Sequence, residues 1–174
     1  MRLFFGLEPD SESALAITAW RDRQLPLLGR PVPVANLHIT LAFLGDISTH
    51  RLERLGKTVD QFIEQKRPQG EALTLNQLGY WPRPGICWLG PQVWPDSLDS
   101  LARSLSRLGT VQGSKADRRK YRPHITLVRG CDFPPPAATS EPLFKLEFDH
   151  FSLYQSRQGS SGVTYQVLAS WPLG

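Results

Sequence analysis

Two identical tetrapeptides carry the side chains best suited to chemistry in this chain of 174 residues. The sequence His-Ile-Thr-Leu occurs at residues 38–41 and again at 124–127, and these copies hold two of the four histidines. At ordinary residue frequencies such a repeat arises by chance roughly once in several hundred chains. We therefore interpret the chain as two structurally similar halves, each with one His-x-Thr motif.

Strand periodicity predicts what each motif presents. Residues i and i+2 point to the same side of a strand, so His38 and Thr40 share one face, as do His124 and Thr126. The intervening Ile and Leu can then pack beneath helices. Displacement at phosphorus needs a base for the nucleophile and an acid for the leaving oxygen, and two imidazoles suit both roles near neutral pH. The two Thr hydroxyls can donate hydrogen bonds to the phosphate oxygens.

Other interpretations of paired histidines find less support. Packing alone would explain the apolar face of each motif and leave the polar face without a reason. A zinc site needs three or four ligands, but the sequence has no His-Glu-x-x-His or Cys-x-x-Cys, and His50 and His150 have the context of structural or surface residues. There is also no glycine-rich phosphate loop of the nucleotide-binding kinds. We expect no metal, no cofactor and no use of ATP.

Basic residues are concentrated just before and just after the second motif. Residues 112–129 contain six Lys and Arg against one Asp, a larger net charge than the +4 of the whole chain. Such a patch suits a phosphodiester backbone. We expect Arg118, Arg119 and Arg122 to contact RNA and Tyr121 to stack on a base. Arg129 is a candidate phosphate ligand, although its odd offset from the second His places it on the opposite strand face unless a bulge turns it inward.

Two further aromatic residues are candidates for stacking. Trp81, in the loop Tyr80-Trp81-Pro82, could form a second platform for a base, or it could simply anchor that loop. Phe43 follows the first motif, and core packing is the simpler expectation for it.

The remaining sequence predicts the elements that position the motifs. Strands and helices alternate with hairpins, which is typical of an α+β fold with mostly antiparallel sheets, and no interior linker divides residues 1–174 into separate domains. No run of apolar residues is long enough to span a bilayer or to form a signal peptide, and Cys87 and Cys131 suit a reducing compartment. We therefore expect a cytoplasmic protein. Strands are predicted at 3–7, 36–44, 73–78, 86–89, 124–128, 145–154 and 164–171, and helices at 11–28, from 48 or 49 to before 68, and 95–108.

Segments across nearly the full length resemble the bacterial RNA 2′,3′-cyclic phosphodiesterases, also called 2′-5′ RNA ligases, of the 2H phosphoesterase superfamily. The resemblance rests first on the duplicated His-x-Thr-x signature, which is that superfamily's motif. It extends through residues 2–7, 36–45, 88–90, 122–129 and 151–156, Tyr165 and Trp171. One departure is Tyr121, where family members often have Phe, and this change retains a stacking ring.

The resemblance implies a bilobal α+β fold of two pseudo-symmetric lobes, mostly antiparallel sheet with helices outside, whose motifs face a central cleft. It implies hydrolysis of a terminal 2′,3′-cyclic phosphate on RNA to a 2′-phosphate without metal or ATP, by a monomer. By carry-over His38 is the proton donor and His124 the proton acceptor, and Thr40 and Thr126 hold the phosphate. The reverse reaction would join RNA ends such as tRNA halves by a 2′-5′ linkage.

Two other hypotheses remain open. One is a 2′,5′-phosphodiesterase that acts on linear oligonucleotides. The other is a non-catalytic module that binds RNA ends in the same groove. The near-symmetry of the two motifs does not itself decide which histidine is the acid and which the base.

Overall fold

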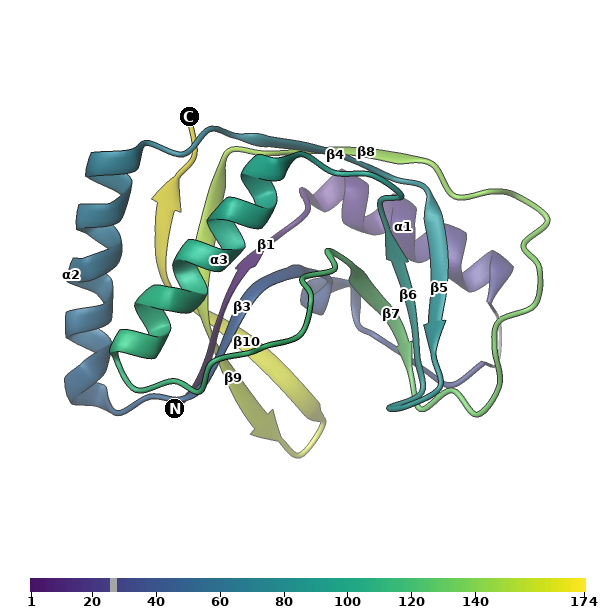
Figure 1. Ribbon diagram of the computed structural model, residues 1–174. Coiled ribbons are helices and arrows are strands. Elements are labelled where there is room, and N and C mark those ends of the chain that lie inside the picture. The colour runs from purple at the N-terminus through teal and green to yellow at the C-terminus, as the bar shows by residue number, and fades with distance from the viewer. Residues whose placement is uncertain (26–27) are drawn as a thin grey trace.

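The computed structural model describes residues 1–25 and 28–174 (Figure 1). Ten strands and three α-helices are found in this part of the chain, together with one short 3₁₀ turn before the first motif. The strands are β1 (Arg2–Leu7), β2 (Arg30–Pro31), β3 (Ile39–Asp46), β4 (Glu71–Leu75), β5 (Gln77–Trp81), β6 (Ile86–Gly90), β7 (Ile125–Arg129), β8 (Phe144–Phe148), β9 (His150–Gly159) and β10 (Gly162–Pro172). The helices are α1 (Ser11–Gln24), α2 (Thr49–Lys66) and α3 (Asp96–Val111), and the 3₁₀ turn is Val34–Asn36.

One large antiparallel sheet contains both motif strands at its centre. Its order is β10-β9-β1-β3-β7-β6-β5, with β2 pairing to β7, while β4 and β8 form a separate two-stranded sheet. We call β10-β9-β1-β3 the first lobe and β7-β6-β5 the second lobe. The two lobes meet where β3 pairs with β7 through the single bridge Ile39–Ile125. On either side the chain repeats one plan, strand-helix-strand, as β1-α1-β3 and as β6-α3-β7. The expected bilobal α+β fold is confirmed.

The helices of the two repeats are exchanged between the lobes. Helix α3, which leads into the second lobe, packs against β3 of the first lobe and beside α2. Helix α1 follows the first strand of the first lobe, but its buried Arg21 donates a hydrogen bond to the carbonyl of Leu127 in β7. In Figure 1, α1 accordingly lies on the side of β5, β6 and β7, and α2 and α3 lie on the other side. Each lobe thus depends on a helix from the other repeat, which binds the two halves into one unit.

Helix boundaries follow local chemistry. Asp10 caps α1 by accepting a hydrogen bond from the amide of Ser13, and Ser48 caps α2 in the same way. In α3, Leu98, Leu101 and Leu105 are spaced three and four apart and are all buried. No helix in the described ranges combines the length and apolarity needed to cross a membrane.

Two predicted strands are each divided in the structure. The strand expected at 73–78 is wrong as a single element, because β4 ends at Leu75 and joins the small sheet, whereas β5 begins at Gln77 in the large sheet. Asn76 lies between them and uses its side chain to accept a hydrogen bond from the amide of Gln92. The strand expected at 145–154 likewise divides at Asp149, where the chain passes from the small sheet to the large one. The helix expected at 11–28 ends at Gln24, and residues 26–27 lie outside the described part of the chain.

Candidate active site

The two motifs face each other about the Ile39–Ile125 bridge. Both Ile side chains are fully buried, whereas the His and Thr of each motif are half-buried, as the alternation predicts. In an antiparallel pair, extending this register by one residue in each direction sets His38 opposite Thr126 and Thr40 opposite His124. The histidine of each motif therefore lies opposite the threonine of the other. This arrangement can set one imidazole on each side of a phosphorus, as in-line displacement requires.

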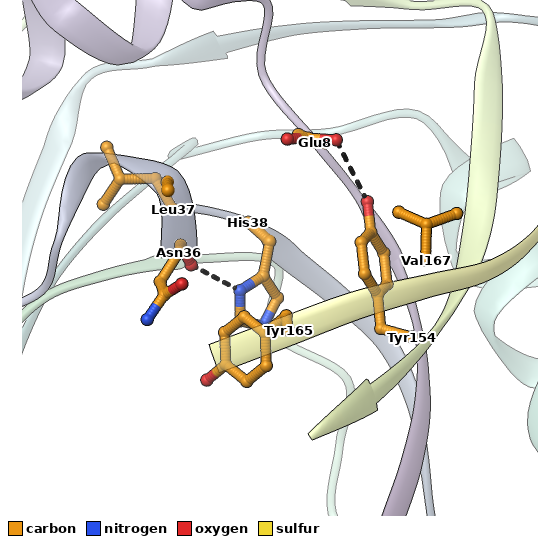
Figure 2. Close-up of a pocket in the computed structure, with 8 residues that line it drawn as sticks. Glu8, Asn36, Leu37, His38, Tyr154, Tyr165 and Val167 are labelled. Atoms are coloured by element: carbon orange, nitrogen blue, oxygen red, sulfur yellow. Dashed lines mark hydrogen bonds between the residues drawn. The ribbon is translucent and has the colours of Figure 1, made fainter. Parts of the chain in front are cut away.

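The ring of His38 is fixed by two hydrogen bonds. Nδ1 lies 2.8 Å from the backbone oxygen of Asn36 (Figure 2). Nε2 lies 3.0 Å from Oγ1 of Thr40. Because only an N–H can pair with the carbonyl oxygen, Nδ1 carries the proton in the neutral ring. The ring of Phe4 lies at 4.7 Å and that of Tyr165 meets it edge-on at 5.0 Å. Burial lowers the pKa of His38 from its ordinary value of 6.5 to about 4, with smaller contributions from neighbouring positive charges.

The ring of His124 has a matching environment. Its Nδ1 lies 2.7 Å from the backbone oxygen of Arg122, so each histidine donates to the carbonyl two residues before it. Trp81 meets the ring edge-on at 4.7 Å and Trp88 lies at 6.1 Å. Burial lowers the pKa of His124, and the charges of Arg122 and Arg129 add to this effect. Within the described residues, Nε2 of His124 has no hydrogen-bond partner, unlike Nε2 of His38.

Each motif strand has a bulge at the motif's Leu. In β3 the residues on either side of Leu41 pair with consecutive residues of β1, and in β7 the residues on either side of Leu127 pair with consecutive residues of β6. The extra residue reverses the alternation beyond it. Val128 is consequently buried next to Leu127, and Arg129 follows as an exposed residue.

These bulges decide where the fifth residue after each histidine lies. The positive charge of Arg129 lowers the pKa of both His38 and His124, a smaller effect than that of burial. The sequence predicted Arg129 on the face of the motif histidines only if a bulge intervened, and β7 has such a bulge at Leu127. At the equivalent place in the first lobe stands Phe43, whose ring is 6.2 Å from that of Phe4. Phe43 is 56% exposed, so the expectation of core packing for it is wrong.

Arg118 and Arg119 lie on an exposed loop between α3 and β7. Both side chains are exposed, and Arg119 forms an ion pair with Asp117 at 2.8 Å. Part of the charge of this loop is therefore neutralised within it. Among these cations Arg118 has no such ion pair within the described residues.

Tyr121 and Arg122 are held inside the protein more firmly than the sequence indicates. The hydroxyl of Tyr121 donates to the backbone oxygen of Thr40 at 3.0 Å, which links the loop before the second motif to the first motif strand. Burial raises the pKa of Tyr121. The guanidinium of Arg122 lies between two indole rings, 4.8 Å from Trp88 and 5.1 Å from Trp94. Both residues line a hollow next to His124.

Several neighbours of the motif histidines carry no sequence signal of their own. Phe4, Tyr154 and Tyr165 come from three strands of the first lobe and form one aromatic cluster beside His38. Only the strand order brings them together. Trp94 likewise lies in the hollow beside His124 only because the fold brings it there. In the described residues no three His, Cys, Asp or Glu side chains gather closely enough to hold a metal ion, and His50 and His150 are exposed.

The chain is similar in sequence to known proteins over nearly its whole length. A family model described as LigT like Phosphoesterase matches residues 7–88 and again residues 89–165, so each match contains one motif. The RNA 2′,3′-cyclic phosphodiesterase of Escherichia coli is 33% identical over 99% of this chain and 96% of its own length. The protein of the same name from Thermus thermophilus is 31% identical over 99% of this chain and 90% of its own.

Solved structures are similar over the same extent. A crystal structure of E. coli LigT complexed with 3′-AMP has a TM-score of 0.87 at 34% identity and covers 99% of this chain and 98% of that one. A further crystal structure of a phosphoesterase has a TM-score of 0.89 at 33% identity, with 99% and 98% covered.

Proposed function

The chain belongs to the LigT-like phosphoesterase family, and from this premise we propose that it is an RNA 2′,3′-cyclic phosphodiesterase that leaves a 2′-phosphomonoester. The observation that carries the proposal is the pairing of β3 with β7, which sets two His-Thr pairs about one point in opposite order. The name of the E. coli relative supports the cyclic phosphate as substrate. The exposed basic loop supports RNA as the molecule that bears it.

Each motif histidine would act through its Nε2 atom. Both Nδ1 atoms are committed to backbone carbonyls, so each ring offers Nε2 to the substrate. His124 would take a proton from water, whose oxygen attacks phosphorus opposite the 3′ oxygen. His38 would give a proton to that leaving oxygen. Because the pKa of His38 is about 4 in the free protein, the bound phosphate must raise it, and a negative charge beside the ring does so.

The phosphate would be held without a metal ion. We assign its non-bridging oxygens to the hydroxyls of Thr40 and Thr126 and to the guanidinium of Arg129. The described residues around the motifs provide imidazole, hydroxyl and guanidinium groups and no cluster of carboxylates. The proposal therefore includes full activity in EDTA, without ATP.

RNA beyond the cyclic end would follow the basic loop. Arg118 and Arg119 are exposed and can approach successive phosphates. Tyr121 and Arg122 line the hollow on the His124 side, so they would contact RNA on the side of the attacking or leaving 5′ oxygen, away from the ribose that bears the cyclic phosphate. The same site run backward would join a 5′-hydroxyl end, such as that of a tRNA half, in a 2′-5′ linkage. We expect the protein to do this as a cytoplasmic monomer.

The test is product analysis on a short RNA that ends in a 2′,3′-cyclic phosphate. In EDTA and without ATP, the wild type should yield the 2′-phosphate. His38→Ala and His124→Ala should each lose at least roughly a hundredfold in rate while RNA binding stays largely intact. His50→Ala, at an exposed histidine on α2, is the matched control and should react as the wild type does.

Other results would select the other hypotheses. Turnover of a linear 2′,5′-linked oligonucleotide without hydrolysis of the cyclic end would indicate the 2′,5′-phosphodiesterase. Tight RNA binding without turnover of either substrate would indicate the non-catalytic module. Normal hydrolysis by both histidine variants would refute the two-histidine mechanism.

A further inference from the structure

An aromatic hollow of about 430 Å³ opens in the second lobe, and we call it the Trp hollow. Its volume lies in the range of pockets that hold small organic ligands. Three indole rings supply most of its apolar wall, and two cationic side chains lie at its edge. Its lining consists of Gln77, Trp81, Trp88, Trp94, Lys120, Tyr121 and Arg122.

The Trp hollow lies on one side of the site only. Trp81 and Trp88 both line the hollow and both lie beside the ring of His124, so the hollow is on the His124 side of the site. The hollow beside His38 is lined by Tyr154 and Tyr165 among others, and its volume is about 50 Å³ (Figure 2). The two sides of the site therefore differ in what they can admit.

The walls of the Trp hollow suit a nucleoside with a phosphate attached. Indole rings stack on any base. The guanidinium of Arg122 is fixed by Oε1 of Gln77 at 2.6 Å and by two indole faces, and within the described residues it forms no ion pair. Lys120 adds a second, exposed positive charge. Trp94 is held in place because its Nε1 donates to Asp99 at 2.8 Å.

The chemistry of in-line displacement says which nucleoside belongs there. The attacking and leaving oxygens lie on opposite sides of phosphorus, and the cyclic nucleotide keeps its ribose on the side of its leaving 3′ oxygen, toward His38. Whatever is attached to the attacking oxygen must extend past His124. We propose that the Trp hollow is the subsite for the nucleoside whose 5′ oxygen enters or leaves phosphorus on the His124 side. This inference rests on the proposed function.

The transfer step balances without a further reactant. The 5′ O–H gives its proton to Nε2 of His124, the bond from the 5′ oxygen to phosphorus forms, and the bond from phosphorus to the 3′ oxygen breaks. The 3′ oxygen takes a proton from His38. The product is a 2′,5′-linked dinucleoside monophosphate with a free 3′-hydroxyl, and the reverse step returns the cyclic phosphate and a 5′-hydroxyl nucleoside.

The test compares two substrates on the full chain. Uridine 2′,3′-cyclic phosphate has no nucleoside on the His124 side, whereas uridylyl-2′,5′-adenosine has one. Trp94→Leu should lower kcat/KM for the dinucleotide by roughly tenfold more than for the cyclic nucleotide, because a stacking partner is lost for only one of them. Lys120→Gln should shift the ratio in the same direction by a smaller factor. Phe133→Leu makes the matched change at an aromatic residue that is 71% exposed and does not line the hollow, and it should leave the ratio unchanged.

Synthesis gives an independent readout. With the cyclic nucleotide and added adenosine, the wild type should form the dinucleotide in a saturable manner, and Trp94→Leu should need roughly tenfold more adenosine. Equal losses on both substrates for Trp94→Leu and Lys120→Gln would overturn the inference while the proposed function stands. So would a wild type that hydrolyses the cyclic nucleotide but neither cleaves nor forms the dinucleotide. Cleavage of the dinucleotide without hydrolysis of the cyclic nucleotide would instead overturn the proposed function and leave the subsite in place.

Discussion

Acid should destabilise the free protein in part through His38, whose pKa is lowered by burial. Its pKa is about 4 in the folded chain and near 6.5 in the unfolded chain, so between these values the unfolded state binds the additional proton. The unfolding free energy therefore falls as the pH decreases from about 6.5 toward 4. The two pKa values give a loss of about 2 kcal/mol at pH 5 relative to pH 7, and about 3 kcal/mol at pH 4.

The assay is urea unfolding at pH 7 and pH 5 for the wild type and for His38→Gln. The glutamine cannot be protonated, so the wild type should lose about 2 kcal/mol more than the variant between the two pH values. His50→Gln replaces an exposed histidine and should behave as the wild type does. An equal pH dependence for the wild type and His38→Gln would refute the reasoning, since His38 would then not be the group that resists protonation.

Phosphate should oppose this effect of acid. A bound anion raises the pKa of His38, so inorganic phosphate should bind more tightly at pH 5 than at pH 7 and should recover part of the lost unfolding free energy. If the measured affinity for phosphate is weaker at pH 5, the anion does not lie beside the ring.

Three further substitutions test the surroundings of the motifs. Arg129→Gln removes a positive charge that lowers the pKa of both motif histidines, so the acid limb of the pH-rate profile should shift to higher pH; an unshifted limb would place the guanidinium elsewhere. Arg21→Leu removes the buried donor to the carbonyl of Leu127 and should cost about 1–3 kcal/mol of unfolding free energy, measured in urea, with Arg21→Lys recovering part of the loss. Tyr121→Phe removes only the O–H that donates to Thr40 and should cost about 1 kcal/mol, so a loss near zero would mean that this bond does not stabilise the contact between the lobes.

Much of the central architecture could be predicted from the repeat. Two copies of one tetrapeptide predicted two similar halves, and the alternation within it predicted buried Ile and half-buried His and Thr in both copies. The prediction of burial succeeds because it depends only on local geometry, and a strand with one face on the core repeats every two residues.

Other features depend on pairing partners that local patterns do not contain. The bulges at Leu41 and Leu127 exist only in relation to β1 and β6. A strict alternation therefore predicted Arg129 on the far face, and core packing remained the simpler expectation for Phe43. The exchange of α1 and α3 between lobes is likewise a long-range choice, because the sequence of a helix does not specify which sheet face the helix covers. Trp94 shows the same limit, since only the fold of the second lobe carries it to the hollow beside His124.

The departures from two-fold symmetry bear most directly on the reaction. A symmetric site would bind a symmetric substrate, but a cyclic phosphate has a ribose on one side and the attacking group on the other. Nε2 of His38 already bonds to Thr40, and His38 lines a small hollow, whereas Nε2 of His124 is without a partner in the described residues and its neighbours Trp81 and Trp88 line a large one. A free Nε2 beside open space suits a base that must receive either water or a 5′-hydroxyl. A closed, aromatic environment suits an acid that meets the same leaving oxygen in every reaction. The asymmetry of the surroundings thus supports the same assignment of acid and base that the near-identical motifs left undecided.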